Sequence, residues 1–321
     1  MNIKATIIFA AALAGGTSAS LADTFEPIKY GDFEQWVTRN IKESSVLGGN
    51  TKQVYEIAPT RTTTSSDPYI NEGGSPWATS NVMANVMGIT KTSNAVFPDQ
   101  RSGGNKCVKL STIMEHCKAA GIINVDVLVA GSIFLGQMIE PVKSTKDPTS
   151  KFEMGIPFTR RPKALMFDYK VTMPTADTRT YSSGFGKKKV IKGRENAEVF
   201  IILQRRWEDK DGNIYAKRVG TGRERFNKST NGWINEHRLK VNYGDITSDP
   251  NYRSWMGLLD GERAYYARNS KGKMVPVHEI GWDDADATPT HIMVMASTAA
   301  GKPYEGTEGL TLWLDNVGLV F

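Results

Sequence analysis

The sequence predicts an all-β fold, arranged as an antiparallel β-sandwich. Helical periodicity is almost absent along the chain, whereas runs rich in β-branched and aromatic residues recur, such as "KALMFDYKVTM", "NAEVFIILQRRW", "NIYAKRV" and "HIMVMAST". Gly, Pro, Asn and Asp interrupt these runs at short intervals, as in "GGSP", "TKDPTS" and "TSDPN". Many short strands joined by frequent turns favour a sandwich of antiparallel strands.

The first 22 residues read as a signal peptide. Met1–Lys4 form a short basic region, "ATIIFAAALA" forms an apolar region too short to span a bilayer, and small residues follow. We therefore expect an exported protein, periplasmic or secreted to the cell surface, with a mature domain over 23–321. No cysteine stands at the cleavage site to carry a lipid, and no later run is long and apolar enough to span a membrane.

The mature region reads as one domain, because it contains no internal repeat, no Pro/Ser linker and no low-complexity tract. In "EDKDGN", Asp211-Gly212 stands where a hairpin turn would join two strands. One modest helix is expected around "DPNYRSWMGLL".

The last strand, "LTLWLDNVGLVF" at 310–321, changes its alternation. Leu310, Leu312 and Leu314 follow one phase, while Val317 and Leu319 follow the other. A strand has period two, so this change predicts a bulge at Asp315-Asn316. A carboxylate in such a strand needs a partner.

Charge and motifs exclude several classes of function. The net charge of +6 is scattered, and its densest run, "GKKKVIKGR", reads as a solvated loop, so no nucleic-acid partner is expected. Common hydrolase, metalloprotease and nucleotide-binding motifs are missing, and the four histidines are dispersed. A glycosidase pair of carboxylates remains open, because spacing in sequence does not give separation in space.

The two cysteines, Cys107 and Cys117, have two readings. In an oxidising compartment they pair as a disulfide, or both are small buried hydrophobic residues.

Aromatic residues point to carbohydrate, because sugar CH faces pack on flat rings while sugar hydroxyls meet polar neighbours. The segment "NYRSWMGLLDGERAYYARNS" is densest in rings and charges. The predicted ligand-binding residues are therefore Trp255, Tyr265, Tyr266, Arg253 and Arg263. The alternative is that these rings fill the end of the sandwich. "GWINEH" offers a second group, Trp233 beside Asn235 and Glu236.

Several segments in order resemble a known family. They are "YGDFEQW", "GSPWATSN", "GNKCVKLST", "VDVLVAGSIFLG", "GIPFTRRPKALMFDYKV" and "MASTAAGKPYEGTEGLTLWLDNVGLVF". From about Tyr30 to Phe321 the chain is similar to the putative carbohydrate metabolism domain of exported Bacteroidota proteins. The resemblance implies a jelly roll akin to carbohydrate-binding modules. It also implies a stand-alone module, because the chain has no room for the immunoglobulin-like domain of many relatives.

The resemblance further implies a structural calcium ion. In many such modules the first and last strands lie side by side and hold the ion, and the matching acids here are Asp32, Glu34 and Asp315. We expect 32–36 to run antiparallel beside 312–317, with Trp36 and Trp313 mostly buried. The alternative for Asp315 is hydrogen bonding to backbone amides at the bulge, or pairing with Arg or Lys.

Three hypotheses for function follow. The first is a non-catalytic module that recognises a glycan, with other glycan-utilisation proteins of the cell envelope as expected partners. The second is a glycoside hydrolase or polysaccharide lyase that uses a carboxylate pair, or Tyr and Arg in a cleft. The third is a structural or adhesive surface protein.

Overall fold

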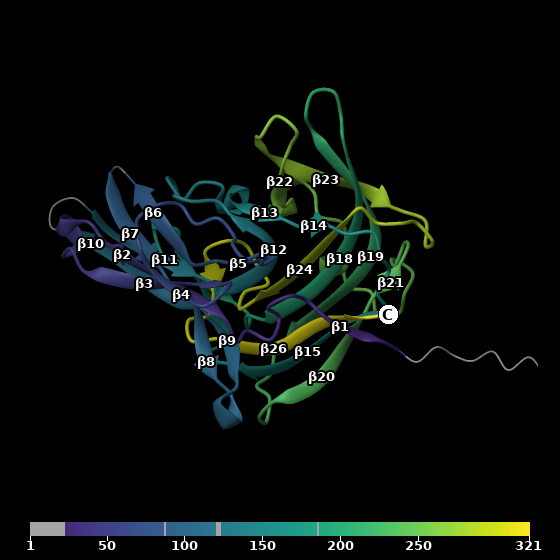
Figure 1. The fold of residues 1–321 in the computed structure, drawn as a ribbon, viewed down its shortest axis with the longest axis horizontal. Coiled ribbons are helices and arrows are strands. Elements are labelled where there is room, and N and C mark those ends of the chain that lie inside the picture. Colours follow the sequence, from purple (N-terminus) through teal and green to yellow (C-terminus); the bar gives the residue numbers. More distant parts are fainter. Residues whose placement is uncertain (1–22, 87, 120–122, 185) are drawn as a thin grey trace, which may run out of the picture.

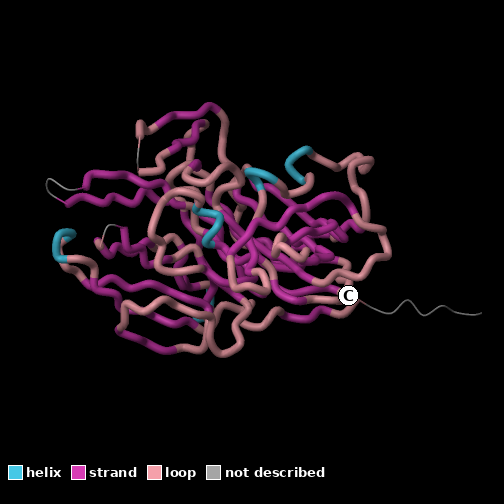
Figure 2. The backbone as a smooth tube through the Cα atoms, turned by 90° about the horizontal axis from the view of Figure 1, so that it is seen from above, coloured by secondary structure: helices cyan, strands magenta, loops and turns pink. Residues whose placement is uncertain are grey.

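The computed structural model describes residues 23–86, 88–119, 123–184 and 186–321 (Figure 1). The predicted signal peptide, 1–22, lies outside the described residues. Strands dominate the described chain, and its helices are single 3₁₀ turns (Figure 2). These turns are Ser45–Leu47, Ser102–Gly104, Pro148–Lys151, Ser254–Met256 and Gly261–Arg263. The helix expected around 249–259 is therefore wrong, since only one short turn forms there, and no described helix could cross a membrane.

One sheet, here called sheet 1, contains the end of the chain. Its strand order is β20-β15-β26-β9-β8, with β1 also paired to β26, and all of its pairings are antiparallel. The bounds are β1 Phe25–Pro27, β8 Val96–Gln100, β9 Lys106–Ser111, β15 Ala164–Thr172, β20 Ile234–Lys240 and β26 Thr311–Val320.

The larger sheet, here called sheet 2, has the order β14-β24-β18-β19-β23-β22-β13-β12-β5, with β21 on β19 and an additional pairing of β12 with β24. Its bounds are β5 Trp77–Thr79, β12 Ser132–Met138, β13 Phe152–Met154, β14 Ile156–Pro157, β18 Ala197–Glu208, β19 Ile214–Phe226, β21 Asn242–Tyr243, β22 Tyr266–Arg268, β23 Met274–Trp282 and β24 His291–Ser297. The predicted turn at Asp211-Gly212 joins β18 to β19 in an antiparallel pair.

Four smaller sheets complete the described fold, and those formed by β2–β4, β6–β7 and β10–β11 lie in the left part of Figure 1. Their strands are β2 Trp36–Lys42, β3 Thr51–Ile57 and β4 Arg61–Thr64; β6 Val82–Val86 and β7 Ile89–Ser93; β10 Ile113–Ala119 and β11 Ile123–Val129; and β16 Thr178–Tyr181, β17 Lys189–Lys192 and β25 Glu305–Gly306.

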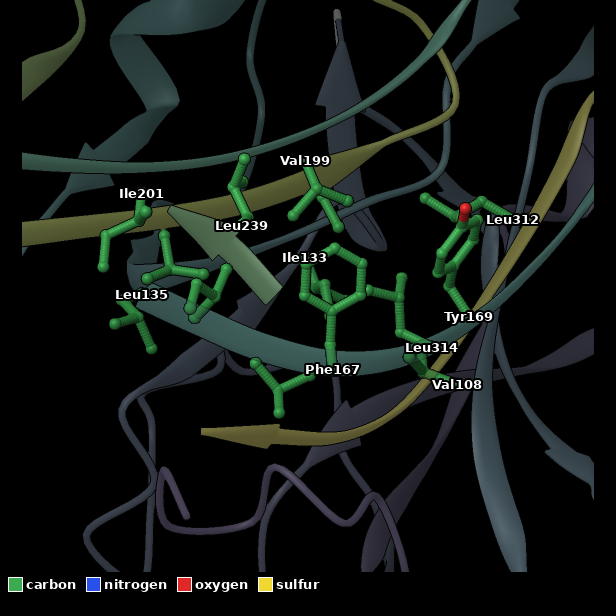
Figure 3. Close-up of a cluster of buried hydrophobic side chains, with 14 of the residues drawn as sticks. Val108, Ile133, Leu135, Phe167, Tyr169, Val199, Ile201, Leu239, Leu312 and Leu314 are labelled. Carbon is green, nitrogen blue, oxygen red and sulfur yellow. The ribbon is translucent and has the colours of Figure 1, made fainter. Parts of the chain in front are cut away.

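The main core lies between sheets 1 and 2. Figure 3 shows Phe167 and Leu314 of sheet 1 in the same buried cluster as Val199 and Ile201 of sheet 2. The next residues along β18, Phe200 and Ile202, pack in a second cluster on the other face of sheet 2. Both faces of β18 are thus buried, which explains why its sequence is apolar without alternation.

The all-β prediction is confirmed, but the pairing is not wholly antiparallel. Three pairs run parallel: β2 with β4, β13 with β22, and β19 with β23. The sequence gives no local sign of these pairs, because the partners in β13–β22 and β19–β23 are joined by long stretches of chain rather than by hairpin turns.

The predicted bulge in the last strand is confirmed. Met166 pairs with Gly318 and Asp168 pairs with Asp315, so β26 has one residue more than β15 in this interval. Asn316 takes a φ of 50° there, which Asn tolerates better than most residues. The extra residue returns Val317 and Leu319 to the core face.

The predicted pairing of 32–36 with the last strand is wrong. The neighbour of β26 is β1, with Phe25 opposite Val320, whereas Trp36 begins β2, which pairs with β3 and β4. The chain stays beside β26 only as far as Gly31, whose carbonyl accepts a hydrogen bond from the Val317 amide, and it then turns away. Trp36 is buried, 4% exposed, as predicted, but Trp313 is only partly buried because it points out of the sandwich.

Candidate functional site

Two aromatic rings on the outward side of sheet 1 alternate with two lysines, and two further rings lie next to them. Across the strands, Phe97 of β8 pairs with Lys109, Lys109 pairs with Trp313, and Trp313 pairs with Lys170. Tyr55 extends this line beyond Phe97, with ring centroids 6.0 Å apart. We call the aromatic residues Tyr55, Phe97, Trp313 and Trp233, together with Lys109 and Lys170, the ring row.

The second tryptophan of the ring row, Trp233, precedes β20. The Lys170 ammonium lies 5.7 Å from its ring centroid and 4.0 Å from that of Trp313, so one cation lies against both rings. All six residues of the ring row are partly exposed. The row therefore combines flat apolar surface with hydrogen-bond donors, the two features that a sugar ring requires.

Trp313 is held in place by Asp99. The indole Nε1 donates a hydrogen bond to Asp99 Oδ2 at 2.8 Å, and the Gln100 amide donates to the other carboxylate oxygen. Burial opposes ionisation, but these hydrogen bonds and the nearby lysines hold the pKa of Asp99 below its ordinary value. The ring orientation is thus fixed by a charged acceptor.

The partner of Asp315 is Arg101, from the turn between β8 and β9. One guanidinium nitrogen, Nη1, lies 2.7 Å from Asp315 Oδ2 and 2.6 Å from Asp168 Oδ2. The Asp315 carboxylate also accepts hydrogen bonds from Asn105 Nδ2 and from the Asn316 amide. This bears out the alternative reading, in which Asp315 pairs with Arg and with an amide at the bulge.

The same arginine connects this network to the ring row. Its guanidinium carbon lies 4.3 Å from the ring centroid of Trp233, and its Nη2 donates to Asn235 Oδ1 at 2.6 Å. The planar guanidinium can satisfy two carboxylates, an amide and a ring face at once, which an ammonium cannot. Arg101 therefore fixes Trp233 beside sheet 1.

The two carboxylates titrate in opposite directions. Burial raises the pKa of Asp315 above its ordinary value despite its hydrogen bonds. Burial also acts on Asp168, but donors from Arg101, the Glu236 amide and Asn316 prevail and lower its pKa. All four carboxylate oxygens accept hydrogen bonds, and Asp168 and Asp315 are 6% and 0% exposed. Neither carboxylate is placed to act on a bound substrate.

Lys109 and Lys170 form no ion pair within the part of the chain that the structure describes. Their interaction with Asp99 is electrostatic and involves no hydrogen bond, and the Asp99 carboxylate already accepts two hydrogen bonds from other groups. The outward side of sheet 1 thus offers two cations that an anionic ligand could neutralise.

The predicted calcium ligands do not come together. Asp315 binds Arg101, Glu34 accepts a hydrogen bond from the Lys106 amide, and Asp32 is exposed. Over the described ranges, no group of three or more His, Cys, Asp or Glu residues could hold a metal ion. The reason is that 32–36 does not pair with β26, so Asp32 and Glu34 do not lie beside Asp315. Calcium binding itself stays a prediction, without this ligand set.

Both cysteine thiols are free in this structure, so the disulfide stays a prediction. Cys107 is fully buried in β9 of sheet 1, as the alternative predicts. Cys117 is partly exposed in β10, a strand of a separate hairpin.

The predicted ligand segment, 252–266, covers part of the outer face of sheet 2. Arg223 Nη1 donates to the Trp255 carbonyl, and Arg225 lies 4.6 Å from the Trp255 ring centroid. The ring of Tyr265 packs 5.9 Å from that of Phe200. We call Arg223 and Arg225 the arginine cluster: both contact Trp255, and Arg223 acts electrostatically on Tyr265. This segment therefore resembles the alternative of rings that pack against the fold.

The other three predicted residues lie apart from that cluster. Arg253 donates to carbonyls of its own loop, Arg263 is exposed, and Tyr266 belongs to β22, where it pairs with Pro276 and Glu153. In the described residues no hydrogen bond or ring contact joins them to Trp255 or Tyr265.

Sequence reasoning missed most of the ring row. Trp233 beside Asn235 was visible in "GWINEH", and Trp313 lies out of phase with its leucine neighbours, which signals an outward ring. Phe97, Lys109 and Lys170 carry no such signal, because only strand pairing aligns them.

The chain has distant likenesses among solved structures. No curated protein matches the sequence. A putative glycoside hydrolase from Bacteroides thetaiotaomicron shares 15% identity with a TM-score of 0.44, covering 85% of this chain and 81% of that one. A putative glycoside hydrolase from Bacteroides vulgatus shares 12% identity with a TM-score of 0.41, covering 92% and 94%.

A carbohydrate-binding module specific for non-crystalline cellulose shares 12% identity with a TM-score of 0.26, covering 77% of this chain and 90% of that one. All three likenesses are distant. The family model named putative carbohydrate metabolism domain, in contrast, matches residues 32–255, more than half of the chain. The chain therefore belongs to the putative carbohydrate metabolism domain family.

Proposed function

We propose that this protein is an exported carbohydrate-binding protein that holds a glycan on the ring row of sheet 1, with acidic sugars preferred over neutral ones. In this proposal the protein has a fold akin to jelly-roll carbohydrate-binding modules and acts without catalysis. The observation that carries the proposal is the alignment of Phe97, Lys109, Trp313 and Lys170 across four adjacent strands.

The spacing of this alignment suits a chain of sugars better than a single sugar. Adjacent strands lie about 4.8 Å apart, so Phe97 and Trp313, two strands apart, are separated by roughly 10 Å. Trp233 and Tyr55 extend the row at both ends. A ligand along the row would cross the strands and meet ring faces and ammonium groups alternately.

The preference for acidic sugars follows from the position of Lys170. Its ammonium lies against the Trp313 ring, so a sugar that packs there must replace a cation–π contact worth about 0.5–1 kcal/mol at an exposed site. A sugar carboxylate compensates for this loss by pairing with the displaced lysine, whereas a neutral sugar does not.

Two of the carboxylates beside the ring row, Asp168 and Asp315, favour binding over hydrolysis. A glycosidase needs one carboxyl that can donate a proton and one carboxylate that can reach the sugar or a water molecule. Asp168 and Asp315 are shielded, and their oxygens are occupied by Arg101, Asn105, Asn316 and the Glu236 amide.

The test compares binding of the mature protein to polygalacturonate and to a neutral galactan, by affinity electrophoresis and calorimetry. We expect saturable binding of the acidic polymer, weakened at least tenfold, about 1.4 kcal/mol, by Trp313→Ala. The matched control is Trp207→Ala, which removes a 40% exposed ring on β18, away from the ring row.

An equal loss in both variants, or unchanged binding in Trp313→Ala, would place the glycan elsewhere. Hydrolysis of either polymer that persists after exhaustive purification would contradict the non-catalytic part of the proposal.

A further inference from the structure

A cavity of about 380 Å³ lies on the outer face of sheet 2, away from the ring row. Its walls come from the hairpins β6–β7 and β10–β11, which both lie at the left of Figure 1, and its floor from β12 and β24. This volume falls in the range of small-molecule sites, roughly 300–1,000 Å³. A macromolecular partner would need a larger open surface.

The walls of the cavity are aliphatic. Every second residue of β6 and of β11 lines the cavity, namely Val82, Ala84, Val86, Val125, Val127 and Val129. All six are partly exposed although they belong to strands, which is the state of apolar side chains that border an unfilled space. Met138 and Met295 of sheet 2 and the ring of Phe152 add further apolar surface.

The hydroxyl groups that line the cavity are mostly engaged within the protein. Ser132 Oγ donates to Ser297 Oγ at 2.8 Å, Ser80 Oγ donates to the Ala130 carbonyl, and Tyr304 Oη donates to the Thr145 carbonyl. A sugar in this cavity would lose water from its hydroxyls without gaining partners, which is unfavourable. The cavity is therefore unsuited to the glycan proposed for the ring row.

Among the described residues, all but one of the cationic side chains that line the cavity form an ion pair with a carboxylate. Lys91 pairs with Glu43 and Glu115, Arg223 with Glu198, and Lys302 with Glu262. Lys151, at the end of the turn Pro148–Lys151, has no ion pair in the ranges that the structure describes. One uncompensated cation beside an aliphatic cavity suits a ligand that has one anionic end.

Two polar atoms in the lining are also available to a ligand. Ser93 Oγ is buried and has no hydrogen-bond partner among the described residues. The Tyr265 hydroxyl meets only the thioether of Met295, at 3.5 Å, which is a weak acceptor. A buried hydroxyl without a partner costs free energy that an acceptor on a ligand would recover.

We propose that this cavity binds a single aliphatic carboxylic acid of fatty-acid type, with its chain between β6 and β11 and its carboxylate beside Lys151. This activity is separate from glycan binding, since the two sites lie on different sheets and share no residue.

The experiment titrates the mature protein with dodecanoate and with dodecanol, both below their micelle concentrations, against a fluorescent fatty-acid analogue. We expect both compounds to displace the analogue, with dodecanoate about tenfold tighter because of its charge-assisted contact with Lys151. Lys151→Gln should remove this difference and leave the affinity for dodecanol unchanged.

Cys117 reports where the ligand sits, because it lines the cavity while Cys107 is fully buried. We expect a thiol reagent to modify Cys117 in the native protein, and saturating dodecanoate to slow that reaction at least about fivefold, since access controls thiol reactivity. A Cys107→Ser variant confirms which thiol reacts. This measurement needs no change to the cavity itself.

Ala84→Phe fills the cavity and should abolish displacement by both compounds. Its matched control, Asn85→Phe, places the same ring on the other side of β6, where Asn85 borders a different hollow. Polygalacturonate binding should be equal in both variants, which separates this proposal from the proposed function.

The proposal is overturned if neither compound displaces the analogue. It is also overturned if displacement occurs without protection of Cys117, or if Ala84→Phe and Asn85→Phe bind alike.

Discussion

At the scale of single residues, the ring row depends on side chains that serve two contacts at once. Lys170 lies against the rings of Trp313 and Trp233, and Asp99 both orients Trp313 and lies in the field of the lysines. A substitution in this group therefore changes the charge and the ring surface together, and charge-only variants are needed to separate the two effects.

Lys170→Gln is such a variant. It removes the positive charge and uncovers the Trp313 ring, so we expect polygalacturonate to bind about three- to tenfold more weakly while a neutral galactan gains affinity or is unchanged. Calorimetry with both polymers measures this. A parallel loss for both polymers would mean that Lys170 acts by packing and not by charge.

His291 should make stability depend on pH. Burial, together with the neighbouring Arg206, lowers the pKa of His291 to about 4, below its ordinary value of 6.5. Between these two pKa values the imidazole is protonated in the unfolded chain but neutral in the folded chain. The contribution of His291 to the free energy of unfolding is therefore fully present above pH 6.5 and is lost as the pH falls towards 4.

We expect His291 to account for up to about 2 kcal/mol of lost stability between pH 7 and pH 5. His291→Gln should lessen the dependence of urea unfolding on pH by that amount. Identical pH profiles for the two proteins would show that the imidazole is not shielded in the folded chain.

At the scale of elements, the alternation of β26 places Asp315 on the outward side, directly before the bulge, and this creates a need for Arg101. Asp315 faces Asp168 of β15, and two neighbouring carboxylates would repel each other without a cation between them. The turn between β8 and β9 supplies that cation and thereby fixes Trp233 as well.

Arg101→Met should destabilise the protein by about 3–5 kcal/mol, because it leaves buried carboxylates without a counter-charge. The control Arg61→Met breaks an exposed pair with Glu72 and should cost less than about 1 kcal/mol. Urea unfolding measures both. Adding Asp168→Asn and Asp315→Asn to Arg101→Met should recover part of the loss, and no recovery would contradict the electrostatic account.

At the scale of the whole molecule, sheet 2 connects two cores. One face of β18 packs against sheet 1, and the other face packs against the second cluster, which includes Leu259 of the segment 252–266. A sheet that is buried on both faces ties the stability of one core to that of the other, as expected for a single domain.

Phe167→Ala in the main core and Phe200→Ala in the second cluster should therefore each lower one shared melting transition, by about 3–5 kcal/mol. Calorimetry with fluorescence at two wavelengths checks this. Two separate transitions, each sensitive to one substitution, would divide the chain into two domains.

The same melts test calcium. A metal ion that binds the native state alone stabilises it by about 2.7 kcal/mol at a hundredfold excess over Kd. The calcium prediction therefore requires a higher melting temperature with calcium than with a chelator. Equal temperatures at saturating calcium would refute it.

The sequence by itself determined what depends on neighbours along the chain. Alternation and turn residues identified the strands, "EDKDGN" identified a hairpin, and the change of phase at Asp315-Asn316 identified the bulge. These features follow from local sterics and from the period of a strand, so a short window of sequence contains them.

Only the tertiary structure decided which strands lie together and which partners the charges have. Arg101 is 214 residues from Asp315, and Phe97, Lys109, Trp313 and Lys170 come from four separate strands. The choice of Phe25–Pro27 over Trp36 as the neighbour of β26 was decided in the same way. Burial and side-chain fit over the whole fold select such long-range pairs, and these quantities leave no local pattern in the sequence.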